Sequence, residues 1–126
     1  MALSKSLSDI FSILEDLPDF YGITISSIDT IGNFGNTPLG VMSSRGDLNS
    51  VRVLLENGAD INHHGDGGYT PLHEAAGRGY IYVVRFLLER GADPREVDDD
   101  GLTPRQIALH CGNLLVADLI DGFNQV

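Results

Sequence analysis

The chain contains one cysteine, Cys111, in 126 residues, so it can form no internal disulfide bond. Small secreted domains are commonly held together by several disulfides, and this sequence excludes that class. Basic residues are also scarce, because 8 Lys and Arg side chains stand against 18 Asp and Glu, which gives a formal net charge of −10. A surface this acidic repels phosphate backbones and anionic lipids, which disfavours binding to nucleic acid or to a membrane surface. The charge instead favours a basic partner.

Long hydrophobic runs are missing as well. No apolar stretch approaches the roughly 18 residues that a membrane-spanning helix needs. Residues 1–5 lead into a segment that carries Asp9, Glu15 and Asp16, unlike a secretory signal peptide. We therefore expect a soluble, cytoplasmic protein. The length of 126 residues and an apolar fraction of 42% predict one globular domain.

The most informative feature that is present is an internal repeat with a period of 33 residues. The dipeptides Thr37-Pro38, Thr70-Pro71 and Thr103-Pro104 are spaced by that interval. Glycines keep the same register before and after each of them, and a Gly-Ala-Asp triplet occurs at 58–60 and again at 91–93. A fixed period of this length predicts a solenoid, in which each unit buries its apolar side against its neighbours.

The second unit shows what each repeat should look like. A helix is expected to start at Pro71, because the Thr70 hydroxyl can accept a free backbone N–H and Pro suits the first helical position. This helix is short and should end at Gly79. A second helix is predicted from about Ile81 to Arg90, where apolar residues recur at helical spacing. Residues 92–102 have a turn composition, which predicts an extended finger.

Two runs of the second unit carry a family resemblance. Residues 68–79 read Gly-Tyr-Thr-Pro-Leu-His-Glu-Ala-Ala-Gly-Arg-Gly, and residues 87–93 read Leu-Leu-Glu-Arg-Gly-Ala-Asp. Together they closely resemble an ankyrin repeat, and the resemblance covers roughly residues 32–123. It implies an all-α solenoid of about three helix-turn-helix repeats, with β-turn fingers and a concave face that binds other proteins. It also implies a hydrogen bond between His73 and the Thr70 hydroxyl, and it brings no catalytic residues.

Residues 1–31 lack the repeat pattern and are expected to form an N-terminal cap. A single apolar stripe on a helix of about Ser4 to Leu17, ended by Pro18, is formed by Leu7, Ile10, Phe11, Leu14 and Leu17. We expect this helix to cover the open apolar side of the first repeat. Alternating apolar residues over 21–25 predict a short extended lead-in to the first finger.

The repeats themselves are expected over residues 32–126, divided at about 32–64, 65–97 and 98–126. In the last unit Asp121 occupies the position that Leu88 fills in the unit before, and Arg105 stands where the pattern has Leu. A charged residue there suits an outermost helix that faces water, so the third unit is predicted to be a C-terminal cap.

Three short patterns could carry chemistry, and each has a weakness. The pair His63-His64 could suggest a metal site, but neighbouring residues of an extended finger point in opposite directions and rarely share one ion. The pair His110-Cys111 has no third residue to orient it, and consecutive helix positions do not face each other. The Gly-rich segment 65–68 lacks the Lys-Ser or Lys-Thr that a phosphate-binding loop requires. We expect no metal, no cofactor and no catalysis.

The segment Glu96-Val97-Asp98-Asp99-Asp100 is the strongest charge feature, with four carboxylates in five residues. Asp suits the backbone of a tight turn, so this segment can be a solvated turn. It can equally be a negative fingertip directed at a basic partner. Its spacing lacks the alternating ligands and the terminal Glu of an EF-hand calcium loop.

Counting from each Thr-Pro gives the positions that the repeat architecture leaves free for a partner, at the fingertips and on the exposed side of the first helix. Phe34, Tyr69 and Leu102 are candidate apolar anchors, and Arg45 and Arg78 form a basic pair one repeat apart. The full set of expected partner-contacting residues is Asn33, Phe34, Asn36, Arg45, Asp66, Tyr69, Arg78, Asp98, Asp99, Asp100, Leu102 and His110.

These features predict a protein-interaction module that is monomeric when free and binds one basic protein partner through its concave face and fingertips. A narrower hypothesis is an inhibitor, such as an immunity protein that neutralises a toxin by covering its basic active site. The alternative is a general adaptor or scaffold that self-associates or regulates an enzyme, without catalysis of its own.

Overall fold

The computed structural model describes residues 6–124, and within this range the regular structure is helical. Two short 3-10 helices are present, η1 (Pro18–Phe20) and η2 (Asp66–Gly68). The α-helices are α1 (Leu7–Glu15), α2 (Pro38–Ser44), α3 (Leu48–Glu56), α4 (Pro71–Arg78), α5 (Ile81–Glu89), α6 (Pro104–His110) and α7 (Leu114–Asn124). The prediction of an all-α fold is confirmed.

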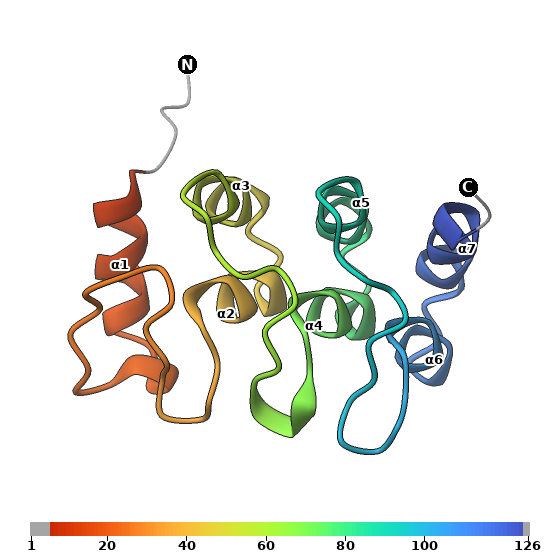
Figure 1. Ribbon diagram of the computed structural model, residues 1–126, viewed down its shortest axis with the longest axis horizontal. Coiled ribbons are helices and arrows are strands. Elements are labelled where there is room, and N and C mark those ends of the chain that lie inside the picture. Colours follow the sequence, from red (N-terminus) through yellow and green to blue (C-terminus); the bar gives the residue numbers. More distant parts are fainter. Residues whose placement is uncertain (1–5, 125–126) are drawn as a thin grey trace.

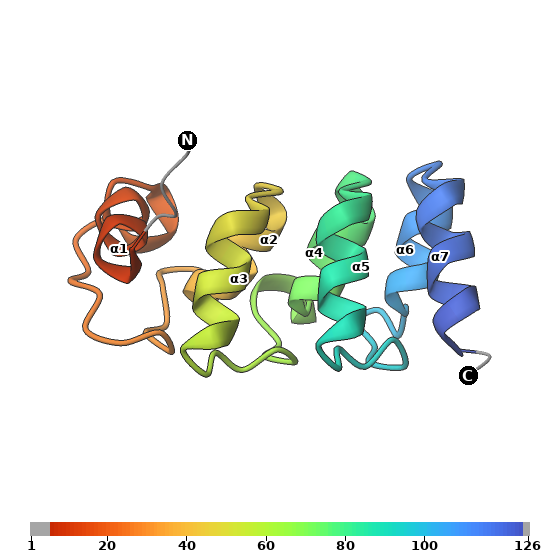
Figure 2. The same cartoon turned by 90° about the horizontal axis from the view of Figure 1, so that it is seen from above.

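Three helix pairs stand side by side and form an elongated solenoid, with α1 at its N-terminal end (Figure 1). The inner helices α2, α4 and α6 make one layer, and the outer helices α3, α5 and α7 make a second layer (Figures 1 and 2). The loops that join one pair to the next are the fingers, which extend beyond the inner helices, away from the outer layer (Figure 1). The inner helices and the fingers therefore share one side of the molecule.

The 33-residue sequence period is also a structural period, because Thr37, Thr70 and Thr103 occupy equivalent corners of the three pairs. Each Thr is the N-cap of an inner helix and is followed by Pro at the start of that helix. In all three, the hydroxyl accepts the backbone N–H of the residue three positions later at 3.3 Å. This bond satisfies one of the N–H groups that the first turn of a helix leaves unpaired.

Gly79 ends α4, as the sequence predicts, and it also allows the next repeat to approach. Its φ of 76° lies in the left-handed region that glycine adopts without strain. The Asn113 side chain donates to the carbonyls of Ala76 and Gly77, both at 3.0 Å, and so holds the third repeat against the end of α4. A Cβ on Gly79 would lie 2.9 Å from the Asn113 amide oxygen.

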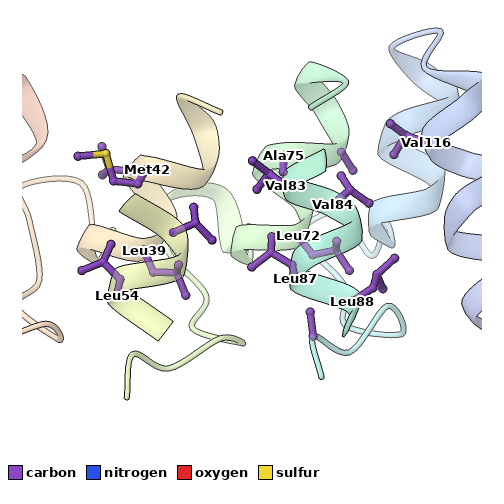
Figure 3. Packing of buried hydrophobic residues seen from close by; sticks show 14 of the residues in the cluster. Leu39, Met42, Leu54, Leu72, Ala75, Val83, Val84, Leu87, Leu88 and Val116 are labelled. Carbon is purple, nitrogen blue, oxygen red and sulfur yellow. The ribbon is translucent and has the colours of Figure 1, made fainter. Parts of the chain in front are cut away.

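A continuous apolar core runs along the solenoid between the two layers (Figure 3). Leu39 and Leu54 fill it in the first repeat, and Leu72 and Leu87 fill it in the second, all at most 1% exposed. Burial of each such side chain stabilises the fold by about 1.5–3 kcal/mol before entropy is counted. Most of the stability of these short helices therefore comes from their neighbours.

The N-terminal helix covers the open apolar side of the first repeat, as we predicted. Ile10, Leu14 and Phe20 are fully buried, and α1 contacts α3. The helix begins later than predicted, at Leu7, because Ser6 is its N-cap, and it ends at Glu15 before the chain turns into η1. The first two residues of the predicted helix, 4 and 5, lie outside the described residues. The lead-in over 21–25 consists of a turn followed by irregular chain.

At the C-terminal end, the two charged residues that replace core leucines pair with each other. The Arg105 guanidinium donates to the Asp121 carboxylate at 2.7 Å. This end is nevertheless partly apolar, because Leu114 is 62% exposed and Leu115 is 73% exposed. No helix within residues 6–124 is both long enough and apolar enough to cross a bilayer.

Candidate functional site

Hydrogen bonds donated by backbone N–H groups join the fingers into one surface. The Asp66 N–H donates to the Asn36 side-chain oxygen at 3.1 Å, which links the first and second fingers. The Asp99 N–H donates to the Gly67 carbonyl at 3.0 Å, which links the second and third. A surface that is ordered before binding loses less conformational entropy when a partner docks.

His73 connects the second inner helix to the third finger. The Thr70 N–H donates to His73 Nδ1 at 3.1 Å, so this nitrogen is an acceptor and the proton must lie on Nε2. Nε2 then donates to the Leu102 carbonyl at 2.8 Å. Nδ1 also lies 2.8 Å from the Thr70 hydroxyl, which confirms the expected hydrogen bond. Burial lowers the pKa of His73, because the charged imidazolium would lose its hydration.

The neighbouring histidines of the second finger point to different partners, as expected for an extended chain. His63 Nε2 lies 3.0 Å from the Gly35 carbonyl of the preceding finger. His64 bridges the Gly68 carbonyl at 2.8 Å and the Glu96 carboxylate of the next finger at 2.9 Å. The Gly68 carbonyl, and then Glu96, raise the pKa of His64. Residues 6–124 contain no group of three His, Cys, Asp or Glu placed to hold a metal ion.

Eight of the twelve expected partner-contacting residues are exposed. Phe34 stands out among them, because a large aromatic side chain at a fingertip is 55% exposed. Exposed aromatic side chains of this kind are enriched at binding sites. The complete set of exposed positions is Asn33, Phe34, Arg45, Asp66, Arg78, Asp99, Asp100 and His110.

Asn33 and Asn36 serve the scaffold rather than standing free. The Asn33 amide donates to the Pro18 carbonyl at 3.2 Å and to the Tyr21 carbonyl at 3.0 Å. The Asn36 amide donates to Asp19 at 3.3 Å while its oxygen accepts from the second finger. Both residues therefore hold the first finger against the N-terminal cap.

Asp98 requires a correction, because it is buried at 5% exposure and cannot offer its side chain to a partner. Its Oδ1 accepts the N–H groups of Asp100 and Leu102, both at 2.9 Å, and so shapes the turn of the third finger. Leu102 is half-buried, and its backbone is held by Asp98 and His73. Within the acidic segment, Asp98 builds the turn, while Asp99 and Asp100 face solvent.

Tyr69 is half-buried, so it is not the free anchor that the sequence suggested. Its ring lies 5.8 Å from the His73 ring, centroid to centroid, at an interplanar angle of 43°. The remaining part of the ring forms one wall of a hollow between α4 and α6. Burial, followed by the charges of Asp98 and Asp100, raises the pKa of the Tyr69 phenol.

This hollow has a volume of about 330 Å³ and includes residues that sequence reasoning missed. Glu74 and Ile107 belong to that group, and they share one register position with Val41, four residues after each capping Thr. Burial raises the pKa of Glu74, although Arg78 attracts its carboxylate and acts in the opposite direction. The lining of the hollow includes Tyr69, Glu74, Gly77, Arg78, Ile107 and Cys111.

The fold and this surface define a helical-repeat solenoid whose inner helices and fingers form a preorganised face. A family model described as "Ankyrin repeats (3 copies)" matches residues 4–98, and the chain belongs to the ankyrin-repeat family. The match starts inside the segment that we set apart as an N-terminal cap. A search of curated proteins found no match to the chain. Membership of this family makes the chain a protein-protein interaction module.

Proposed function

We propose that this chain binds one basic protein across its inner helices and fingertips. The observation that carries the proposal is the acidity of this face, where Asp66, Asp99 and Asp100 are exposed on adjoining fingers of a chain with a net charge of −10. Complementary charge speeds the encounter of two proteins more than it tightens the final complex. The exposed Phe34 ring supplies an apolar contact beside these charges.

A narrower form of the proposal is that the chain is an inhibitor, of the kind that an immunity protein represents, and that it covers a basic active site. The preorganised fingers support this form, because a rigid surface can block a site without first folding around it. The alternative is an adaptor that self-associates, which the exposed Leu114 and Leu115 favour. Light scattering of the purified chain separates the two, since the inhibitor is expected to be monomeric.

We also propose a cytoplasmic location. Cys111 is a free, exposed thiol, and a reducing compartment keeps such a thiol from oxidation.

The experiment that tests the proposal is capture of a partner with two matched baits. The finger variant changes three exposed carboxylates of the fingertips, and the outer-helix variant changes three exposed carboxylates of the opposite layer. Both therefore alter the net charge equally. The substitutions are D66N, D99N and D100N in the finger variant and E56Q, E89Q and D118N in the outer-helix variant.

We expect the wild-type chain and the outer-helix variant to retain one basic protein, and the finger variant to lose it. The association rate should fall as salt rises, because the Debye length shortens to about 3 Å at 1 M. Equal capture by both variants, or capture of an acidic protein, would contradict the proposal. For the inhibitor form, one equivalent of the chain must also abolish the activity of the captured protein.

A further inference from the structure

The chemistry of the hollow between α4 and α6 narrows the kind of side chain that it can receive. Three walls matter here: the Tyr69 ring, the Glu74 carboxylate and the apolar side chain of Ile107. They come from two successive repeats, so the hollow exists only because α4 and α6 pack together. It opens on the side of the molecule that the proposed function assigns to the partner.

Glu74 is the unusual member of the lining. Its carboxylate is half-buried and makes no hydrogen bond or close ion pair with any residue in the described part of the chain. A partly desolvated carboxylate without a close partner costs free energy, which a cation brought by a ligand would recover. The pKa of Glu74 is raised for the same reason, because burial destabilises the charged carboxylate more than the attraction of Arg78 stabilises it.

The surroundings of the hollow also favour a cation. The charges of Asp98 and Asp100 raise the pKa of the Tyr69 phenol, and the charge of Asp66 raises the pKa of Glu74. Carboxylates of both adjoining fingers therefore make the electrostatic potential at the hollow more negative. The electron-rich face of a tyrosine ring attracts a cation placed over it. Arg78 is the one cationic side chain in the lining, and it is itself exposed.

Gly77 keeps the floor of the hollow open. A Cβ at this position would lie 3.0 Å from the nearest carbon of Ile107, which is tighter than ordinary packing. Any larger residue would therefore either push Ile107 away or fill the space that faces Tyr69 and Glu74.

We propose that this hollow receives one arginine side chain of the basic partner, with its guanidinium against the Tyr69 ring and paired with the Glu74 carboxylate. The inference rests on the function proposed above. Arginine fits better than lysine, because its planar guanidinium stacks on aromatic rings, pairs with a carboxylate through two N–H groups and is more weakly hydrated.

The test is a nuclear magnetic resonance titration of the full chain with the capped peptide acetyl-Gly-Gly-Arg-Gly-Gly-amide. Matched peptides carry lysine or the neutral isostere citrulline in place of arginine. We expect the arginine peptide to shift the backbone signals of α4 and α6 around the hollow, the lysine peptide to bind more weakly, and the citrulline peptide to leave these signals unchanged. Shifts confined to the fingertips or the outer helices, or equal binding of all three peptides, would overturn the proposal.

Two substitutions test the sign of the charge that the hollow accepts. E74Q should weaken binding of the arginine peptide about tenfold, as expected for loss of a charge-assisted hydrogen bond. R78Q should tighten it about two- to fivefold, because an exposed repelling charge is removed. The control E56Q removes a carboxylate from the outer layer and should change the affinity by less than about twofold. If R78Q instead weakens binding of the arginine peptide, or E74Q leaves it unchanged or strengthens it, the guanidinium does not pair with Glu74 and the proposal is wrong.

A structural role for Glu74 gives a different result. If Glu74 only supported α4, E74Q would lower the free energy of unfolding. If Glu74 is instead a desolvated charge without a close partner, the free energy of unfolding of E74Q at neutral pH should equal or exceed that of the wild type. The inference and the proposed function can also fail separately. A partner that still docks on the inner helices and fingers of E74Q with unchanged affinity overturns the arginine assignment and leaves the function intact.

Discussion

Replacement of His73 tests how the repeats are coupled, because this buried side chain joins α4 to the third finger. His73→Ala removes the bond to the Leu102 carbonyl and the contacts of Nδ1 with Thr70. Each such hydrogen bond contributes about 0.5–1.5 kcal/mol, and a buried partner left unpaired adds about 1–3 kcal/mol. With the cavity that remains, we expect a loss of about 3 kcal/mol, a large part of the stability of a domain this size.

The chain offers a matched control in its third repeat. Gln106 stands at the position of His73 and caps its helix, since the Thr103 N–H donates to its side-chain oxygen at 2.9 Å. His73→Gln should therefore keep the bonds within α4 and lose mainly the bond to Leu102, at a cost of about 1 kcal/mol.

Urea denaturation followed by circular dichroism measures both losses, provided that the m-values agree. If His73→Ala costs less than about 1 kcal/mol, the bond to Leu102 does not couple the repeats and the reasoning is refuted. Equal losses for the two variants would show that the capping contacts contribute nothing.

Three further predictions follow from the cap, the fingertips and the buried histidine. Leu14→Ala should lower the free energy of unfolding by about 2–5 kcal/mol, because Leu14 is fully buried between the cap and the first repeat. Phe34→Ala should weaken the complex with the captured partner by about tenfold or more while leaving stability nearly unchanged. Stability should fall as pH drops below the usual His range near 6.5, because the pKa of His73 is lowered in the folded state and the unfolded chain then binds more protons. His73→Gln should remove this part of the pH dependence.

Each of these predictions has a control and a contrary result. Ser12 is exposed on the same helix as Leu14, so Ser12→Ala should be nearly neutral, and an equal loss in both variants would refute the capping role. A Phe34→Ala variant that binds as tightly as the wild type would remove this side chain from the interface. A pH profile of His73→Gln that matches the wild type would show that another group titrates.

The architecture was predictable because its rules are local and repeated. A Thr-Pro pair starts each inner helix and a glycine lies at or just after its end, and three copies of this pattern exclude coincidence. The N-terminal cap followed from one apolar stripe. The structure begins this helix at Leu7, because the Ser6 hydroxyl caps it by accepting the Asp9 N–H.

The site was predictable only in part, because the direction of a side chain depends on contacts between repeats. Asp98 and Asp99 are neighbours of the same chemistry, yet one is buried in the turn and the other faces solvent. The hollow needs Ile107 of one repeat to lie against Gly77 of another, and no local rule contains that contact. One signal was present in the sequence: Glu74 is a charged residue at the register position that Val41 and Ile107 fill with apolar side chains.

The central claim is that the inner helices and fingers bind a basic partner. The most direct test is to compare hydrogen exchange of the purified complex with that of the free chain. The account predicts that binding slows exchange in residues 66–78 and 98–111, while the outer helices α5 and α7 exchange as they do in the free chain. Protection of α5 and α7 without protection of the fingers would contradict it.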